Sequence, residues 1–156
     1  MNMLKPGDKA PAFTLEDQNG RLVSLEDFAG RRVVVYFYSR DNTPGCTRQA
    51  CSFRDSFAGF AARGIPVLGI SRDPAKSHAA FAARHGLPFT LLSDPQRTAI
   101  EGFGVWQPKT LYGKTSMGVV RSSFVVGPDG AVQKVFPKAS PDANAGQLLA
   151  WLEENP

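Results

Sequence analysis

The sequence predicts a mixed α/β fold formed by one domain over residues 1–156, and three observations support this. The length of 156 residues is close to the usual size of one compact domain. Short apolar segments alternate with longer amphipathic ones, as expected when helices cover a sheet. The segment Val33–Tyr38 is β-branched or aromatic at every position, which is typical of a strand buried on both faces. We therefore expect this strand at the centre of the sheet.

The N-terminal part of the chain predicts a β-hairpin. Phe13–Leu15 and Leu22–Ser24 are short segments of strand type, and residues 17–20 between them read Asp-Gln-Asn-Gly. Asn and Gly are common in tight turns because they tolerate positive φ angles. The two segments are therefore expected to pair as antiparallel strands.

A long helix and a second strand are predicted after the central strand. Cys46–Ala62 carries apolar residues at a spacing near 3.6 and is followed by Gly64, so we expect a helix that ends at this glycine. Ile65–Ile70 is again almost entirely apolar. We predict that it forms a second buried strand.

A second helix is predicted to begin at Asp73 and Pro74 and to end at Gly86. Asp can cap the first turn of a helix, Pro is tolerated there, and Gly favours the left-handed end. Phe89–Leu92 is expected to form a third, shorter strand, and a short helix is expected after it.

The C-terminal third predicts a second hairpin and a last helix. Val119–Val126 and Ala131–Phe136 are expected to be its strands, because the residues Gly-Pro-Asp-Gly at 127–130 supply the turn. Ala143–Glu153 is predicted to be an amphipathic helix whose inward face carries Leu148, Leu149 and Leu152. Helices are then expected on both faces of a sheet with parallel and antiparallel strands.

Composition and charge exclude several classes of function. Lys and Arg number 18 against 14 Asp and Glu, but the longest basic run is the pair Arg31-Arg32, so no nucleic-acid partner is expected. The longest apolar run has six residues, whereas a membrane-spanning helix needs about 20. The N-terminus lacks the apolar stretch of a signal peptide, so we expect the cytoplasm, where structural disulfides are uncommon.

Two cysteines suggest chemistry more strongly than any other residues. Cys46 follows Pro44 and Gly45 at the predicted start of the long helix. Free backbone N–H groups and the positive end of the helix dipole favour a thiolate at this place. The Cys46 thiol is therefore expected to have a lowered pKa and to be nucleophilic. For Cys51, a role as a small apolar core residue explains the sequence as well as a chemical role does.

Two polar residues could assist the Cys46 thiol, and each has a simpler interpretation. The Thr43 hydroxyl could turn toward the sulfur or a substrate oxygen, or it could only cap the helix. Arg121 lies midway in the predicted strand Val119–Val126. A guanidinium inside a sheet needs an anionic or polar partner, which the thiolate could supply, whereas one on an edge strand would lie in water.

The residues resemble those of peroxiredoxins, and within them the bacterioferritin-comigratory, or Q-type, thiol peroxidases. The segment 41–51, which reads DNTPGCTRQAC, carries the most specific part of the resemblance. Further matches follow in order over nearly the whole chain, at residues 6–15, 36–38, 93–95, 104–106, 109, 112–114, 117–124 and 129–130.

The resemblance implies a thioredoxin-like fold, with a central mixed sheet flanked by helices, and the reduction of hydrogen peroxide and organic hydroperoxides. It implies that Cys46 is the peroxidatic cysteine, that Cys51 resolves it as an intramolecular disulfide, and that Thr43 and Arg121 activate the site. A thioredoxin-type protein would be the reductant, and no metal or organic cofactor is implied. We expect a monomer, because Cys51 removes the need for a partner's cysteine.

Three further residues are predicted to support the site. Gly45 precedes the peroxidatic position, and Gln49 stands where many relatives carry a Glu that holds the Arg. Ser39 stands where the family signature Pro-x-x-x-Thr-x-x-Cys has its proline. Because a proline ring restricts the chain, the serine is expected to leave the thiol pocket wetter or looser.

Helix geometry predicts a conformational step. Residues five apart on a regular helix have Cα atoms about 8.7 Å apart, but a disulfide tolerates at most about 7 Å. If Cys46 and Cys51 lie on one helix when reduced, its first turns must unwind before the two sulfurs can bond.

Two alternative functions compete with this interpretation. A thioredoxin-like dithiol-disulfide oxidoreductase without peroxidase activity would normally use Cys-x-x-Cys, and four residues separate the cysteines here. A metal-binding module could use Cys46, Cys51, His78 and His85. Their spacing matches no zinc pattern, and we expect both histidines to be solvated on a surface helix.

Overall fold

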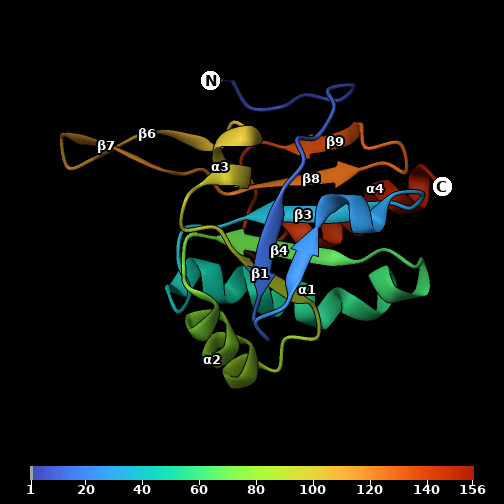
Figure 1. Ribbon diagram of the computed structural model, residues 1–156, viewed down its shortest axis with the longest axis horizontal. Helices are drawn as coiled ribbons and strands as arrows, with labels where there is room; N and C mark the ends of the chain where they lie inside the picture. Colours follow the sequence, from blue (N-terminus) through green and yellow to red (C-terminus); the bar gives the residue numbers. More distant parts are fainter. Residues whose placement is uncertain (1) are drawn as a thin grey trace.

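A computed structural model describes residues 2–156, and its centre is a mixed sheet of seven strands in the order β2-β1-β5-β4-β3-β8-β9 (Figure 1). The strands β3 and β4 run parallel, as do β4 and β5, and the other neighbours are antiparallel. The mixed α/β class is confirmed. The strands of this sheet are β1 (Thr14–Asp17), β2 (Leu22–Ser24), β3 (Val33–Phe37), β4 (Val67–Ser71), β5 (Thr90–Ser93), β8 (Ser122–Val126) and β9 (Val132–Phe136).

Strand β3 is buried along its whole length, as predicted. It lies one place from the middle of the sheet rather than at the centre, because β4, β5, β1 and β2 follow on one side and only β8 and β9 on the other. Its side chains alternate between two apolar cores. Val33, Val35 and Phe37 point into one core, and Val34 and Tyr36 point into the other.

Helices cover both faces of the sheet, as predicted. The second core of β3 is closed by residues of α1 (Pro44–Ala62), α2 (Ala75–His85) and α4 (Asn144–Glu154). The first core is closed by α3 (Thr98–Gly102), by the 3-10 helix η1 (Leu25–Phe28) and by the N-terminal segment. In α4, Leu148 and Leu152 are buried and Leu149 is half-buried against Gly59 of α1. None of the helices in residues 2–156 is long and apolar enough to cross a membrane.

The predicted strand Val119–Val126 is wrong as a single element. Val119 pairs with Trp106, but Ser122 pairs with Phe37 of β3. The chain therefore passes from one sheet to another between these positions, and Arg121 lies at the break instead of inside a strand.

A two-stranded ribbon that we did not predict contains the first part of that segment. It consists of β6 (Trp106–Leu111) and β7 (Lys114–Val119), and it projects from the body of the molecule (Figure 1). Tyr112 and Gly113 form its tip with φ angles of 52° and 77°. Most of its residues are exposed, so the alternation of apolar and polar residues that reveals a half-buried strand is absent.

The predicted cap of α2 is also wrong. Pro74 occupies the N-cap position, and the Asp73 carboxylate accepts hydrogen bonds from the Ser71 hydroxyl at 2.6 Å and the Asp41 amide at 3.0 Å. The Asp73 carboxylate thus joins the loop after β4 to the loop before α1 and does not cap α2. The predicted end of α2 is confirmed, because Gly86 adopts the left-handed conformation there.

Candidate active site

Cys46 lies in the first turn of α1. Thr43 is the N-cap residue with extended backbone angles, Pro44 follows at a position where its missing N–H costs nothing, and the Thr47 amide closes the first turn on the Thr43 carbonyl at 2.8 Å. The predicted placement of Cys46 at a helix start is confirmed. Only 2% of Cys46 is exposed, and both cysteines are free thiols.

The Thr43 hydroxyl does not cap the helix. It donates to the Arg40 carbonyl at 2.9 Å. A hydroxyl carries one proton that turns about the C–O bond, so rotation can move this proton from the Arg40 carbonyl to the Cys46 sulfur. Thr43 therefore contributes its backbone to the helix start and keeps its side chain available to the thiol.

Arg121 reaches the thiol from the break between β7 and β8. Its Nη2 donates to the Cys46 Sγ at 3.4 Å, and its Nη1 donates to the Gln49 Oε1 at 2.7 Å. Gln49 is fully buried one helical turn after Cys46. The side chain of Arg121 thus has the polar partners that a half-buried guanidinium requires, and it does not lie free in water.

The Cys46 thiol ionises more readily than an ordinary cysteine. Burial by itself raises its pKa, but hydrogen bonds from the Arg40 backbone and the Thr43 side chain, together with the positive charge of Arg121, lower the pKa below its usual value. A thiolate in such surroundings is a good nucleophile near neutral pH.

Gly45 leaves the space that Arg121 occupies. A Cβ atom at Gly45 would lie 3.1 Å from Nη2 of Arg121, which is closer than ordinary contact. The glycine therefore permits the guanidinium to pass beside the first turn of α1.

A hollow of about 470 Å³ opens beside these groups. Ser39, the serine at the family proline position, is exposed and lines it. Two other hollows, of about 340 and 350 Å³, contain none of the predicted site residues. The hollow near the thiol is lined by Ser39, Arg40, Thr43, Gly45, Arg72, Trp106, Lys109, Gly118, Val119 and Arg121.

Cys51 lies further along α1 and is half-buried. Its Sγ is 4.0 Å from Nδ1 of His85 at the end of α2. The Arg54 guanidinium donates to the His85 carbonyl at 2.9 Å, which joins the two helices at this point. Cys51 thus lies at the contact between α1 and α2.

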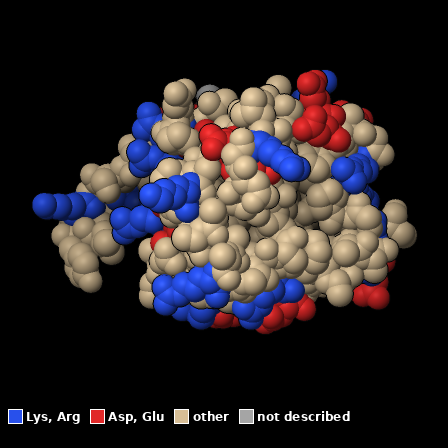
Figure 2. Space-filling model, turned by 60° about the horizontal axis from the view of Figure 1, so that its bottom comes forward, with Lys and Arg blue, Asp and Glu red and all other residues tan. Residues whose placement is uncertain are grey.

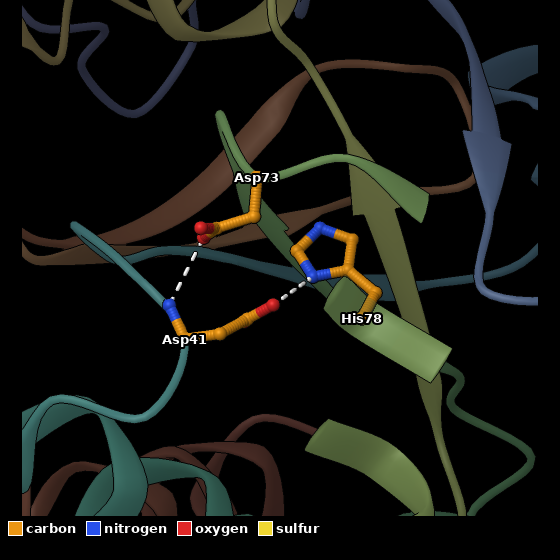
Figure 3. A group of neighbouring side chains, drawn as sticks. All are labelled: Asp41, Asp73 and His78. Atoms are coloured by element: carbon orange, nitrogen blue, oxygen red, sulfur yellow. Dashed lines mark hydrogen bonds and ion pairs between the residues drawn. The ribbon is translucent and has the colours of Figure 1, made fainter. Parts of the chain in front are cut away.

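The expectation that His78 is solvated is wrong. His78 is fully buried, and its Nδ1 lies 2.8 Å from the Asp41 carboxylate (Figure 3). Its Nε2 lies 3.0 Å from the Leu92 carbonyl. Asp41 also accepts hydrogen bonds from the hydroxyls of Tyr38 and Ser77. A carboxylate and a carbonyl only accept, so both ring nitrogens of His78 donate and the pair is ionic.

The four residues suggested for a metal-binding module do not come together as one group, although Cys51 and His85 lie 4.0 Å apart. Within residues 2–156, the one group of His, Cys, Asp or Glu atoms close enough to share an ion is Asp41, Asp73 and His78. Figure 3 shows that these side chains already bind one another or the backbone. Neither Cys46 nor Cys51 belongs to this group.

Sequence reasoning missed several residues that shape the site. Asp41 ties the loop before α1 to His78 of α2, and His78 in turn contacts the Leu92 carbonyl of β5. The position of Asp41 two residues before Thr43 was the available signal. Arg72 and Trp106 line the hollow from separate segments. Arg72 and Trp106 come together only because of the path that the β6–β7 ribbon takes, and no local sequence pattern indicates that path.

Comparison with known proteins places this site in a family. The sequence pattern of the AhpC/TSA family matches residues 6–135, and the chain therefore belongs to the AhpC/TSA family.

Individual relatives agree with this assignment. A putative peroxiredoxin of Mycobacterium tuberculosis is 54% identical over 129 residues, which cover 83% of this chain and 82% of that protein. The Escherichia coli peroxiredoxin Bcp is 46% identical over 155 residues, 99% of each chain. The structure of the Xanthomonas campestris bacterioferritin comigratory protein has a TM-score of 0.87 at 35% identity, and the match covers 92% of this chain and 91% of that one. The predicted resemblance, the thioredoxin-like fold and the enzyme class, a thiol peroxidase, are confirmed.

Proposed function

We propose that Cys46 is the residue that this peroxidase oxidises, and that Cys51 resolves it. The observation that carries the proposal is the contact of 3.4 Å between Nη2 of Arg121 and Sγ of Cys46 at the start of α1. A buried thiol is inert in apolar surroundings, whereas a thiol with a cationic donor and helix-start amides is a nucleophile.

In the first step, the Cys46 thiolate attacks the terminal peroxide oxygen. The O–O bond breaks, that oxygen stays on sulfur as a sulfenic acid, and the second oxygen leaves as alcohol or water after taking a proton. Arg121 and the Thr43 hydroxyl border the hollow next to the thiol. They can hold the peroxide oxygens and offset the negative charge that develops on the departing one.

In the second step, the Cys51 sulfur attacks the sulfenic sulfur of Cys46. A disulfide forms and the sulfenic oxygen leaves as water. Both cysteines belong to α1 of the same chain, so no cysteine from a second copy is needed. We infer that the enzyme works as a monomer in the reducing cytoplasm, with no nucleic-acid or membrane partner.

Turnover then requires an external dithiol. The family implies a peroxide substrate and a thioredoxin-type reductant for this chain. The Xanthomonas campestris relative has alkyl peroxide reduction activity, which supports organic hydroperoxides beside hydrogen peroxide as substrates. No metal or organic cofactor enters either step.

Peroxide consumption with thioredoxin, thioredoxin reductase and NADPH tests the proposal. Cys46→Ser is expected to abolish consumption, and Cys51→Ser is expected to stop after one equivalent, with a single oxygen added to the protein by mass spectrometry. Sustained turnover by Cys46→Ser would refute the assignment. An insulin-reduction assay on the same samples tests the alternative function, because a general dithiol-disulfide oxidoreductase reduces insulin and leaves peroxide unchanged.

A further inference from the structure

The hollow beside Cys46 has an unusual charge. Four of the side chains that line it are cationic, and none is acidic. Its volume of about 470 Å³ suits a small molecule. Figure 2 shows Lys and Arg side chains gathered at the left end of the molecule, over the β6–β7 ribbon and its base. The four cationic residues are Arg40, Arg72, Lys109 and Arg121.

These four charges are not neutralised by carboxylates. Among residues 2–156, the basic side chains that form salt bridges are Arg48, Arg54, His78 and Arg97. None of these salt-bridged residues lines the hollow. Like charges placed together repel one another, and the repulsion is strongest where a charge is partly desolvated, as at the half-buried Arg121. Burial, with the nearby charge of Arg121, lowers the pKa of Lys109. An anion in the hollow would relieve this repulsion.

One of the four cations, Arg72, is held in place by an aromatic side chain. The guanidinium of Arg72 lies 4.9 Å from the ring centroid of Trp106, and that of Arg97 lies 4.6 Å from the same ring. The cation–π contact fixes the Arg72 side chain and leaves its N–H groups free to donate, whereas Arg97 also pairs with Glu101 and does not line the hollow. Val119 and Gly118 add an apolar surface to the same hollow, which can accept a hydrocarbon stem.

We propose that the hollow selects organic hydroperoxides that carry a carboxylate. The carboxylate would bind to Arg72, Arg40 and Lys109, while the hydroperoxide group reaches Arg121 and the Cys46 thiol. This inference rests on the proposed function of Cys46. The carboxylate is unchanged in the reaction: oxygen passes to the Cys46 sulfur, the O–O bond breaks, and the alkoxide takes a proton to become an alcohol.

A matched pair of substrates tests the proposal. Cumene hydroperoxide and its para-carboxylate differ only in the charged group. Their second-order rate constants with the reduced enzyme are measured by stopped-flow Trp fluorescence, without reductant. We expect the carboxylate to react about tenfold faster at low salt, and this ratio to fall toward one at 0.5 M NaCl, since salt screens exposed charges.

Arg72→Gln is expected to lower the ratio of the two rate constants by about two- to fivefold, the range for one exposed charge pair. Arg84→Gln removes an exposed charge of α2 that does not line the hollow, and it is the control that keeps the wild-type ratio. Fluorescence titration of the reduced enzyme with benzoate gives a second readout, in which Arg72→Gln weakens binding.

Three results would overturn the inference. One is equal rate constants for the two peroxides in the wild-type enzyme. Another is the same ratio of the two rate constants, carboxylated over uncharged peroxide, in Arg72→Gln and in Arg84→Gln. The last is a loss in Arg72→Gln confined to reduction by thioredoxin, which would assign the cations to a protein partner. Wild-type enzyme that fails to react with hydrogen peroxide would instead refute the proposed function, so the two failures are distinguishable.

Discussion

Nη2 of Arg121 lies 3.4 Å from Sγ of Cys46, although 75 positions separate the two residues in the chain. The guanidinium therefore contacts the sulfur directly and favours its charged form. Loss of this contact removes both a hydrogen bond and a positive charge from the thiolate.

Arg121→Gln is accordingly expected to raise the pKa of the Cys46 thiol and to slow its reaction with peroxide about ten- to a hundredfold, the usual value of a hydrogen bond to a charged group. The measurement is the second-order rate constant from pH 4 to 9. In the wild type, the rate falls as the pH drops through the lowered thiol pKa, and in the variant this fall begins at higher pH. Superimposable pH profiles would show that Arg121 does not act on the thiol.

Gly45→Ala tests the space that the guanidinium needs. The new Cβ would lie 3.1 Å from Nη2 of Arg121, so the guanidinium must shift by a few tenths of an ångström. We expect a several-fold slower reaction with peroxide. Stability should not fall, because Ala favours a helix over Gly by about 1 kcal/mol. Stopped-flow kinetics and urea unfolding of the same samples measure the two effects. A general packing defect would lower both the rate and the stability, whereas we expect only the rate to fall.

Ser39→Pro tests the departure from the family signature. Within residues 2–156 the Ser39 amide donates no hydrogen bond, so the proline loses none, and its ring would narrow the hollow beside Thr43. We expect faster oxidation of Cys46 by hydrogen peroxide. Ser39→Ala is the control that removes the hydroxyl without the ring. An unchanged rate in Ser39→Pro would end the idea that the serine loosens this pocket.

Asp41→Asn tests the buried ion pair with His78. Burial alone raises the pKa of Asp41, but the hydrogen bond and charge of His78, with hydrogen bonds from Tyr38 and Ser77, lower it below its usual value. The pair therefore stabilises the fold above the ordinary Asp pKa of about 3.9, and this contribution is lost as the pH falls through the lower folded value.

We expect Asp41→Asn to lower the free energy of unfolding by about 3 kcal/mol at pH 7, because it leaves a buried cation without its partner. Below pH 4 the difference from wild type should shrink. Urea unfolding between pH 2 and 7 is the measurement. Asp142→Asn, which removes an exposed partner of Arg48, is the control and should cost less than 1 kcal/mol. A similar loss in both variants would contradict the buried pair.

Local patterns predicted most of the fold. The β-branched run of β3, the glycine end of α2 and the turn residues of both predicted hairpins are each set by neighbouring residues. Strand β3, the end of α2 and both hairpin pairings are confirmed, although the strand predicted over Val119–Val126 begins only at Ser122. The position of Cys46 at the start of α1 was also predictable, because Pro44 favours a first turn.

Contacts between distant segments were not predictable in the same way. His78 occupies a helix position typical of a solvated residue, and only the fold brings it to the Asp41 carboxylate. Arg121 was recognised as a candidate although its strand was wrong, because a partly buried guanidinium needs a polar partner both inside a strand and at a break between strands. The cations of the hollow come from four separate segments, so no spacing along the chain could reveal them.

The positions of the two cysteines on α1 lead to the last prediction. Cys46 and Cys51 both lie within the helix Pro44–Ala62 as free thiols, so the condition for the predicted conformational step is met. A regular helix holds Cα atoms five residues apart at about 8.7 Å, beyond the limit of about 7 Å for a disulfide. The first turns of α1 must therefore unwind as the disulfide forms.

Unwinding also separates Cys46 from Arg121, because the contact depends on the first turn of α1. We expect amide hydrogen exchange over residues 43–54 to be faster in the disulfide form than in the dithiol form, with a smaller helical signal in circular dichroism. Cys51→Ser treated with the same peroxide is the control, because it is oxidised at Cys46 without forming the bond. Equal protection of these amides in both forms of the wild type would show that the helix accommodates the disulfide without unwinding.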